Sequence, residues 1–240
     1  MSVSKYWNGD KLRIEMMSPV KNKEHSAIYN CYLQLRELII TGKLPPRKKL
    51  KIDELRGILN MGASPVREAL GLLTSDMLVE RLDQRGFRVS PVSQENFNEI
   101  LNLRCSLEVI ALRASIANAD EDWENNLVLK HHKMQQCKRQ QKTQFELAHK
   151  AFHFALLQNA KMPILERYCS QLYDLNIRYR NIASADTGYD ERNVEYEHQT
   201  IFDAALEKDA NAASTALVDH YCKTSSYLTS RIINNNLFHM

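Results

Sequence analysis

The stretch Gly62–Leu70 reads GASPVREAL, and it decides the fold of the N-terminal part of the chain. Ser64 supplies a hydroxyl that can cap a helix, and Pro65 suits the first helical position because no backbone hydrogen bond is lost there. The stretch therefore predicts a helix from Ser64 to about Ser75. Its apolar residues recur at helical spacing, and they are Val66, Ala69, Leu70 and Leu73.

A second helical pattern, over 52–60, comes just before this stretch, and Gly62 is expected to make the turn between the two helices. The residues expected on its inner face are Leu55, Ile58 and Leu59. Two short helices that meet at a glycine turn predict a helix-turn-helix. An earlier helix is expected to begin at Ser26 and to end before Gly42.

Two short strands are expected after the helix-turn-helix, over 77–82 and 87–92, around a tight turn. A β-hairpin in this place is typical of a wing. Three helices and a two-stranded wing together predict a winged helix-turn-helix domain over 26–92. Residues 1–25 are polar without a sustained period, so we expect a flexible arm with a short helical piece near 12–17.

The remainder of the chain is predicted to be an all-α bundle. Helical spacing of apolar residues predicts helices over 95–119, 122–140, 143–160, 163–183, 190–206 and 210–232. We expect residues 93–232 to form one helical domain and 233–240 a frayed tail. The fold class is therefore mainly α, a winged helix followed by a helical bundle.

Composition excludes several classes of protein. Glycine and proline together number 13 of 240 residues, which argues against collagen and turn-rich β-sandwiches. The longest apolar runs, such as 109–112, are far too short to span a bilayer, and the first residues lack the apolar core of a signal peptide. Five scattered cysteines without metal-binding spacing predict free thiols. We expect a cytoplasmic protein without membrane contact.

Charge is divided unevenly along the chain. Residues 26–92 carry eleven Lys/Arg and seven Asp/Glu, a net charge of +4, whereas residues 93–240 carry sixteen and nineteen, a net charge of −3. This asymmetry indicates that the N-terminal domain binds a polyanion.

A helix-turn-helix can bind double-stranded DNA by placing its second helix in the major groove. We expect Ser64 and Pro65, at the start of that helix, to face a phosphate, and Arg67 to reach a guanine or a phosphate. Arg67 could instead form a surface salt bridge. The remaining expected contacts are Lys51 at the start of the preceding helix and Arg85 and Gly86 at the tip of the wing.

Four histidines of the helical half are candidate metal ligands. His149 and His153 are four residues apart and share one helical face, close enough for one ion. His198 and His220 lie in other predicted helices, and a bundle could bring all four together. Spacing alone leaves open that they are unrelated core or surface histidines. The other four are expected on the surface, and they are His25, His131, His132 and His239.

Residues 50–89, with PVREAL in the second helix and QRGFRV in the wing, resemble the winged helix of GntR-family transcription regulators. That resemblance implies DNA contacts at Ser64, Arg67, Arg85 and Gly86. The chain has Ala63 where the family commonly has an arginine, and it reads IDEL over 52–55 in place of an E-R-E-L turn. Two arginine contacts are therefore missing, and the preferred operator should differ from the usual one.

Residues 98–228 resemble the FCD-type helical domain of the FadR-like branch of that family. Its D-x-x-x-H pair corresponds to His149 and His153, its E-H-x-x-I histidine to His198, and its last histidine to His220. The family usually has Asp or Asn at the first of these positions. Four neutral imidazoles favour Zn²⁺, Ni²⁺ or Cu²⁺ over Mg²⁺ or Ca²⁺, and they leave the site more positive.

The resemblance further implies a small carboxylate effector, with Arg104 in the matching position as its partner. Arg104 could instead pair with Glu108, and the sequence does not decide whether Arg178 and Arg180 face the pocket. The leading hypothesis is a repressor or activator that binds a palindromic operator as a homodimer. Alternatives are a regulator that responds to the metal ion itself, a structural or pH-responsive histidine site, and a metal-dependent hydrolase, which four histidine ligands disfavour.

Overall fold

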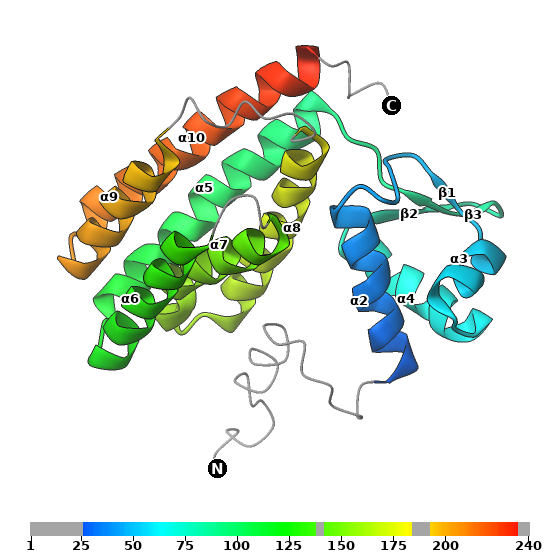
Figure 1. Ribbon diagram of the computed structural model, residues 1–240, viewed down its shortest axis with the longest axis horizontal. Coiled ribbons are helices and arrows are strands. Elements are labelled where there is room, and N and C mark those ends of the chain that lie inside the picture. Colours follow the sequence, from blue (N-terminus) through cyan, green and yellow to red (C-terminus); the bar gives the residue numbers. More distant parts are fainter. Residues whose placement is uncertain (1–25, 138–141, 184–192, 235–240) are drawn as a thin grey trace. The chain divides into compact units, whose positions relative to one another are not determined.

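The computed structural model describes residues 26–137, 142–183 and 193–234, and Figure 1 shows their course. The expected arm 1–25 and residues 235–240 of the expected tail, with His25 and His239, lie outside these residues, whereas residues 233 and 234 belong to the last helix. The described residues form two compact units. One unit comprises 26–105, 169–183 and 221–234, and the other comprises 106–137, 142–168 and 193–220.

The winged helix begins with α2 (Ala27–Ile40), α3 (Ile52–Leu59) and α4 (Ala63–Ser75). Ser26 caps α2, because its hydroxyl accepts a hydrogen bond from the Tyr29 amide at 3.3 Å. The four apolar residues expected inside α4 are all fully buried. Leu55 and Leu59 of α3 are buried as well, but the prediction for Ile58 is wrong, because its side chain is 63% exposed.

The turn between α3 and α4 differs from the prediction in two ways. Asn60, and not Gly62, adopts the left-handed conformation that ends α3, with φ of 52°. Gly62 is the N-cap of α4, so Ser64 and Pro65 lie inside its first turn. Proline is tolerated there because the first amides of a helix have no carbonyl partner within it. The predicted cap was therefore placed two residues too late.

The wing is a three-stranded antiparallel sheet in the order β1-β3-β2. The expected hairpin forms from β2 (Val79–Leu82) and β3 (Gly86–Val89), and Leu82 pairs with Gly86 at its end. Gly86 has φ of +88°, a conformation that a side chain would strain, which explains the glycine in this turn. A further strand, β1 (Lys49–Leu50), pairs with β3 and was not predicted.

Six helices follow the wing among the described residues, as predicted, and together with the winged helix they confirm the fold class. They are α5 (Gln94–Ala117), α6 (Glu121–Gln136), α7 (Lys142–Leu157), α8 (Pro163–Ala183), α9 (Val194–Leu206) and α10 (Ala210–Asn234). A 3-10 turn over Gln158–Ala160 extends α7. No helix in the described part of the chain combines the length and the apolar character that crossing a membrane requires.

The C-terminal half of α8 contacts the winged helix within one compact unit. Arg36 of α2 forms an ion pair with Asp174, and the Asn181 side-chain amide donates to the Ile40 carbonyl at 2.9 Å. Gln171 donates to the Ser75 carbonyl at the end of α4 at 3.1 Å. These bonds join α8 to both α2 and α4.

Candidate DNA interface and candidate metal centre

The expected DNA contacts lie on the surface of the winged helix. Ser64 and Arg67 are exposed on the first turns of α4, and Pro65 between them is half-buried. Exposed amides at a helix N-terminus favour a phosphate. Arg85 and Gly86 are exposed in the wing turn, where the Arg85 amide donates to the Leu82 carbonyl at 3.0 Å.

Two of these candidates have intramolecular carboxylate partners. The Ser64 hydroxyl donates to the Glu68 carboxylate at 2.8 Å, and the Lys51 ammonium forms a 2.9 Å ion pair with Glu54. Glu54 raises the pKa of Lys51 through this contact. A phosphate would compete with Glu68 for the single Ser64 hydroxyl hydrogen, whereas the Lys51 ammonium has three donors and can bind a phosphate while it keeps Glu54.

A basic cluster, Arg47, Lys48 and Lys49, lies at the start of the wing, and all three side chains are exposed. The backbone fixes them to the wing, because the Arg47 amide donates to the Val89 carbonyl and the Val89 amide donates to the Lys48 carbonyl. These three charges contribute to the net charge of +4 over residues 26–92, but no individual role was predicted for them. The charged Lys49 followed by the apolar Leu50 was the available sequence signal, and it matches the exposed and buried faces of the strand.

The four candidate metal ligands lie together in the interior of one compact unit. His149 and His153 come from α7, His198 from α9 and His220 from α10. All four are buried, with 1–6% exposed, and their potential ligand atoms lie within 4.8 Å of one another. The Nε2 atoms of His149 and His153 are 3.2 Å apart. Nitrogen ligands on a tetrahedral zinc ion are separated by about 3.3 Å, given the usual bond length.

A carboxylate orients one of these histidines. The Nδ1 of His220 donates to the Glu197 carboxylate at 2.7 Å, and both side chains are at least nine-tenths buried. Nε2 is then the nitrogen that His220 can offer to an ion. Carboxylate partners of this kind fix the tautomer of metal-binding histidines and raise their basicity. The donor set therefore fits a transition metal that prefers imidazole.

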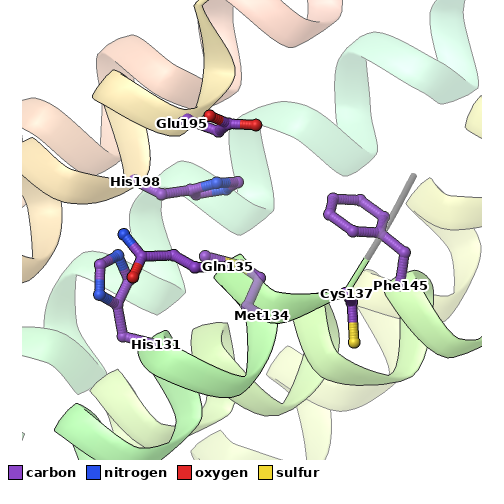
Figure 2. Close-up of a pocket in the computed structure, with 7 residues that line it drawn as sticks. All are labelled: His131, Met134, Gln135, Cys137, Phe145, Glu195 and His198. Atoms are coloured by element: carbon purple, nitrogen blue, oxygen red, sulfur yellow. The ribbon is translucent and has the colours of Figure 1, made fainter.

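His131 is not on the surface, so that prediction is wrong. Its side chain is 4% exposed, and its ring stacks on Phe202 with centroids 4.1 Å apart and planes 12° from parallel. Burial lowers its pKa, so the imidazole is neutral at pH 7. His132, the next residue, is exposed as expected. Figure 2 shows His131 lining a small cavity together with His198.

Arg104 is buried in the other compact unit, with 5% of its surface exposed. Its Nη1 donates to the Asn176 side chain at 3.0 Å. The guanidinium also lies over the rings of Tyr173 and Tyr221, at 5.2 and 4.2 Å from their centroids. These contacts hold a cation in an aromatic environment.

Arg178, which sequence reasoning left undecided, is 2% exposed and donates to the carbonyl of Ser90. Burial lowers its pKa to about 10, so the guanidinium stays charged at pH 7. The next residue, Tyr179, donates its hydroxyl to Asn96 at 2.7 Å and accepts a hydrogen bond from the Ser93 amide. Ser90 and Ser93, at the two ends of the link between β3 and α5, are thus both hydrogen-bonded to α8.

A winged helix with a basic surface, followed by a helical domain, defines a class of DNA-binding transcription regulators. Residues 29–89 match the bacterial regulatory proteins of the gntR family, and residues 99–222 match the FCD domain. The chain belongs to the GntR family and carries an FCD domain.

Relatives agree with this family, and a solved structure shares the fold. The chain is 32% identical over 209 residues to an uncharacterized HTH-type transcriptional regulator, BphR, of Paraburkholderia xenovorans (strain LB400), covering 84% of each. It is 30% identical over 197 residues to the HTH-type transcriptional repressor GlaR of Escherichia coli (strain K12), covering 79% of this chain and 90% of that one. The structure of E. coli McbR/YncC aligns with a TM-score of 0.75 and 22% identity, over 86% of this chain and 99% of that one, which shows the shared fold.

Proposed function

We propose that this protein is a regulator whose operator binding responds to a metal ion and a small organic acid bound by the helical domain. The observation that carries the proposal is the buried group of four histidines, whose ligand atoms lie within 4.8 Å of one another. Imidazole nitrogens gathered at this spacing are ligands that a divalent transition metal prefers. The metal we propose is zinc in the first place, with nickel as the next candidate.

The metal would supply a positive charge to which a carboxylate is attracted. Four neutral imidazoles do not reduce the charge of the ion, whereas an aspartate in the place of His149 would. Arg104, a buried guanidinium, is the residue that we propose to bind the effector's carboxylate. The acid regulates only if it binds the DNA-competent and the DNA-incompetent arrangements with different affinities.

In the winged helix, we propose that Arg67 enters the major groove of DNA. Ser64 and Pro65, at the start of α4, face a phosphate. Lys51 contacts the backbone, and Arg85 and Gly86 contact the minor groove or the backbone beside it. All of these residues are exposed except the half-buried Pro65, and this exposure supports the roles. Two such domains in a homodimer would read the two halves of a palindromic operator.

The same histidine set favours a second candidate, in which the ion alone is the signal. A tetrahedral zinc ion with four protein ligands has no open position for a carboxylate. Such a protein would change its operator affinity with metal and without any organic acid. An ion with four protein ligands also has no bound water to activate. We therefore propose a regulator and not a hydrolase.

Thermal melting of the purified protein, with and without metal, against a panel of small organic acids separates these functions. A stabilising shift with one acid that disappears after metal removal supports the effector proposal, because ligands that bind the native state stabilise it. A shift with metal alone favours the metal-responsive candidate. His220→Ala should abolish either shift, whereas the exposed His132→Ala should preserve it. A protein whose melting temperature does not change with metal would refute the metal centre.

A further inference from the structure

The histidine cluster poses a problem of access. Its four ligands are 1–6% exposed, so an ion cannot reach them directly from solvent. A metal site needs a route by which the ion enters and leaves. The structure offers one cavity that shares a wall with the cluster, because His198 belongs to both.

This cavity lies among α6, α7 and α9 and has room for about two water molecules, with a volume of about 30 Å³. Its inner part is made of buried residues, His131, Met134 and His198, and its outer part reaches solvent at exposed Gln135 and Glu195 and half-buried Cys137. Phe145 completes the lining. The cavity therefore runs from the surface to a ligand of the cluster (Figure 2).

At the inner end of the cavity, the imidazole of His131 is a buried polar group whose hydrogen bonding the fold does not satisfy. Its Nε2 is buried and has no hydrogen-bond partner among the described residues, an arrangement that costs free energy. The ring stacks on Phe202 and also contacts Phe152, at 5.2 Å between centroids. Phe152 in turn contacts the rings of His153 and His198, each at 5.5 Å. One aromatic ring thus separates His131 from two of the cluster ligands.

We propose that this cavity is the route by which a divalent transition-metal ion reaches the four histidines, with His131 as its transient ligand. The inference rests on the proposed metal centre. An ion that sheds water on leaving solvent needs replacement ligands at each step. Glu195 and Cys137 offer an oxygen and a sulfur at the mouth, His131 offers an imidazole nitrogen inside, and His198 receives the ion into the cluster.

The test is the rate of metal loading into metal-free full-length protein, followed with Co²⁺ by its visible absorption and with Zn²⁺ by competition with a coloured chelator. His131→Phe keeps a flat ring against Phe202 but has no ligand atom. We expect it to slow loading about tenfold. Removal of the ion by chelator should slow by the same factor, because a ligand of the route alone leaves the equilibrium affinity unchanged. Cys137→Ser, a milder change at the mouth, should also slow both rates.

His132→Ala is the matched control, because that histidine neighbours His131 on α6 but is exposed, and it should load like the wild type. If His131→Phe and Cys137→Ser both load at the wild-type rate while binding the metal equally tightly, the route is wrong and the metal centre stands. A loss of equilibrium affinity in His131→Phe without slower loading also overturns the route. If the wild-type protein takes up no metal, the proposed metal centre fails, and the inference fails with it.

Discussion

Arg67 is the side chain on which sequence readout of DNA should depend most. It is exposed on the second turn of α4, and a guanidinium can donate two hydrogen bonds to one guanine. We expect Arg67→Ala to weaken operator binding by about 1–3 kcal/mol and to relax base preference at one position of each half-site. Fluorescence anisotropy with DNA selected from a random pool measures both. Arg113→Ala, an exposed arginine on α5, should bind like the wild type, and equal binding by the two variants would remove Arg67 from the interface.

Glu197 should act on the metal through His220 without binding the ion. Its carboxylate accepts the Nδ1 hydrogen of His220 at 2.7 Å in a buried setting. A glutamine there keeps the size of the side chain but loses the charge that makes the imidazole more basic. We expect Glu197→Gln to lower metal affinity about 10–100-fold, the usual effect of such partners. Chelator competition measures the affinity, with the exposed Glu207→Gln as control, and an unchanged affinity would show that the carboxylate is not coupled to the site.

At the level of single elements, the sequence predicted α4 well because one face of it is a continuous apolar stripe. Its start was misplaced because Ser64 and Pro65 are compatible with two registers at the N-terminus. Gly62 caps the helix, and the Ser64 hydroxyl bonds to Glu68 instead. Boundaries depend on such local competition, which periodicity does not report.

Elements that depend on distant partners were harder to predict. The strand β1 is two residues long and exists because Lys49 and Leu50 pair with β3. His131 is buried because α9 places Phe202 against its ring. No residue near His131 in the sequence indicates that contact. The four candidate ligands were nominated by spacing and by resemblance to a known domain. That three helices bring their ligand atoms within 4.8 Å of one another is a tertiary property that spacing alone left open.

The helix α8 is the element through which the helical domain should influence the wing. Arg178 and Tyr179 bond to residues 90, 93 and 96, and the same helix contacts α2 and α4. Arg178→Met keeps the bulk of the side chain but removes the bond to Ser90. The free energy that couples two binding sites is typically about 1–3 kcal/mol. We expect Arg178→Met to lose most of the coupling between ligand binding and operator binding.

Operator affinity of the Arg178→Met protein, measured with and without metal and acid, gives this coupling, and metal affinity measured in parallel should be unchanged. Arg167→Met, an exposed arginine on the same helix, is the control and should retain the full response. A full response in Arg178→Met would place the coupling elsewhere.

At the scale of the whole molecule, the uneven charge predicts how DNA binding depends on salt. The basic cluster adds exposed positive charge to the winged helix, which also carries the exposed Arg67 and Arg85. Lysines that neutralise phosphates release counterions, so the logarithm of affinity falls linearly with the logarithm of salt concentration. We expect Lys48→Ala to reduce that slope by about 1 and to weaken binding equally for all sequences. Titrations at several salt concentrations test this, and an unchanged slope would mean that Lys48 contacts no phosphate.

Reading a palindrome also requires two copies of the chain, and exposed apolar side chains suggest where they meet. Leu103 and Ile110, on α5, are 43% and 50% exposed, and they lie seven residues apart on one face of that helix. Ile164 and Tyr168 form a similar pair on α8, 75% and 54% exposed. Exposed apolar side chains that share a helix face in this way are candidates for an interface between subunits.

We therefore expect light scattering to give twice the chain mass of 27.8 kDa for the wild-type protein. Ile110→Lys should shift the protein toward the monomer, because a lysine charge would be buried in the interface without a partner. Operator affinity should fall with it, since one winged helix reads only one half-site, while metal affinity should be retained. Val128→Lys, which replaces a similarly exposed residue on α6, should remain dimeric. A wild-type protein that remains a monomer while it binds a full palindrome tightly would contradict this assembly.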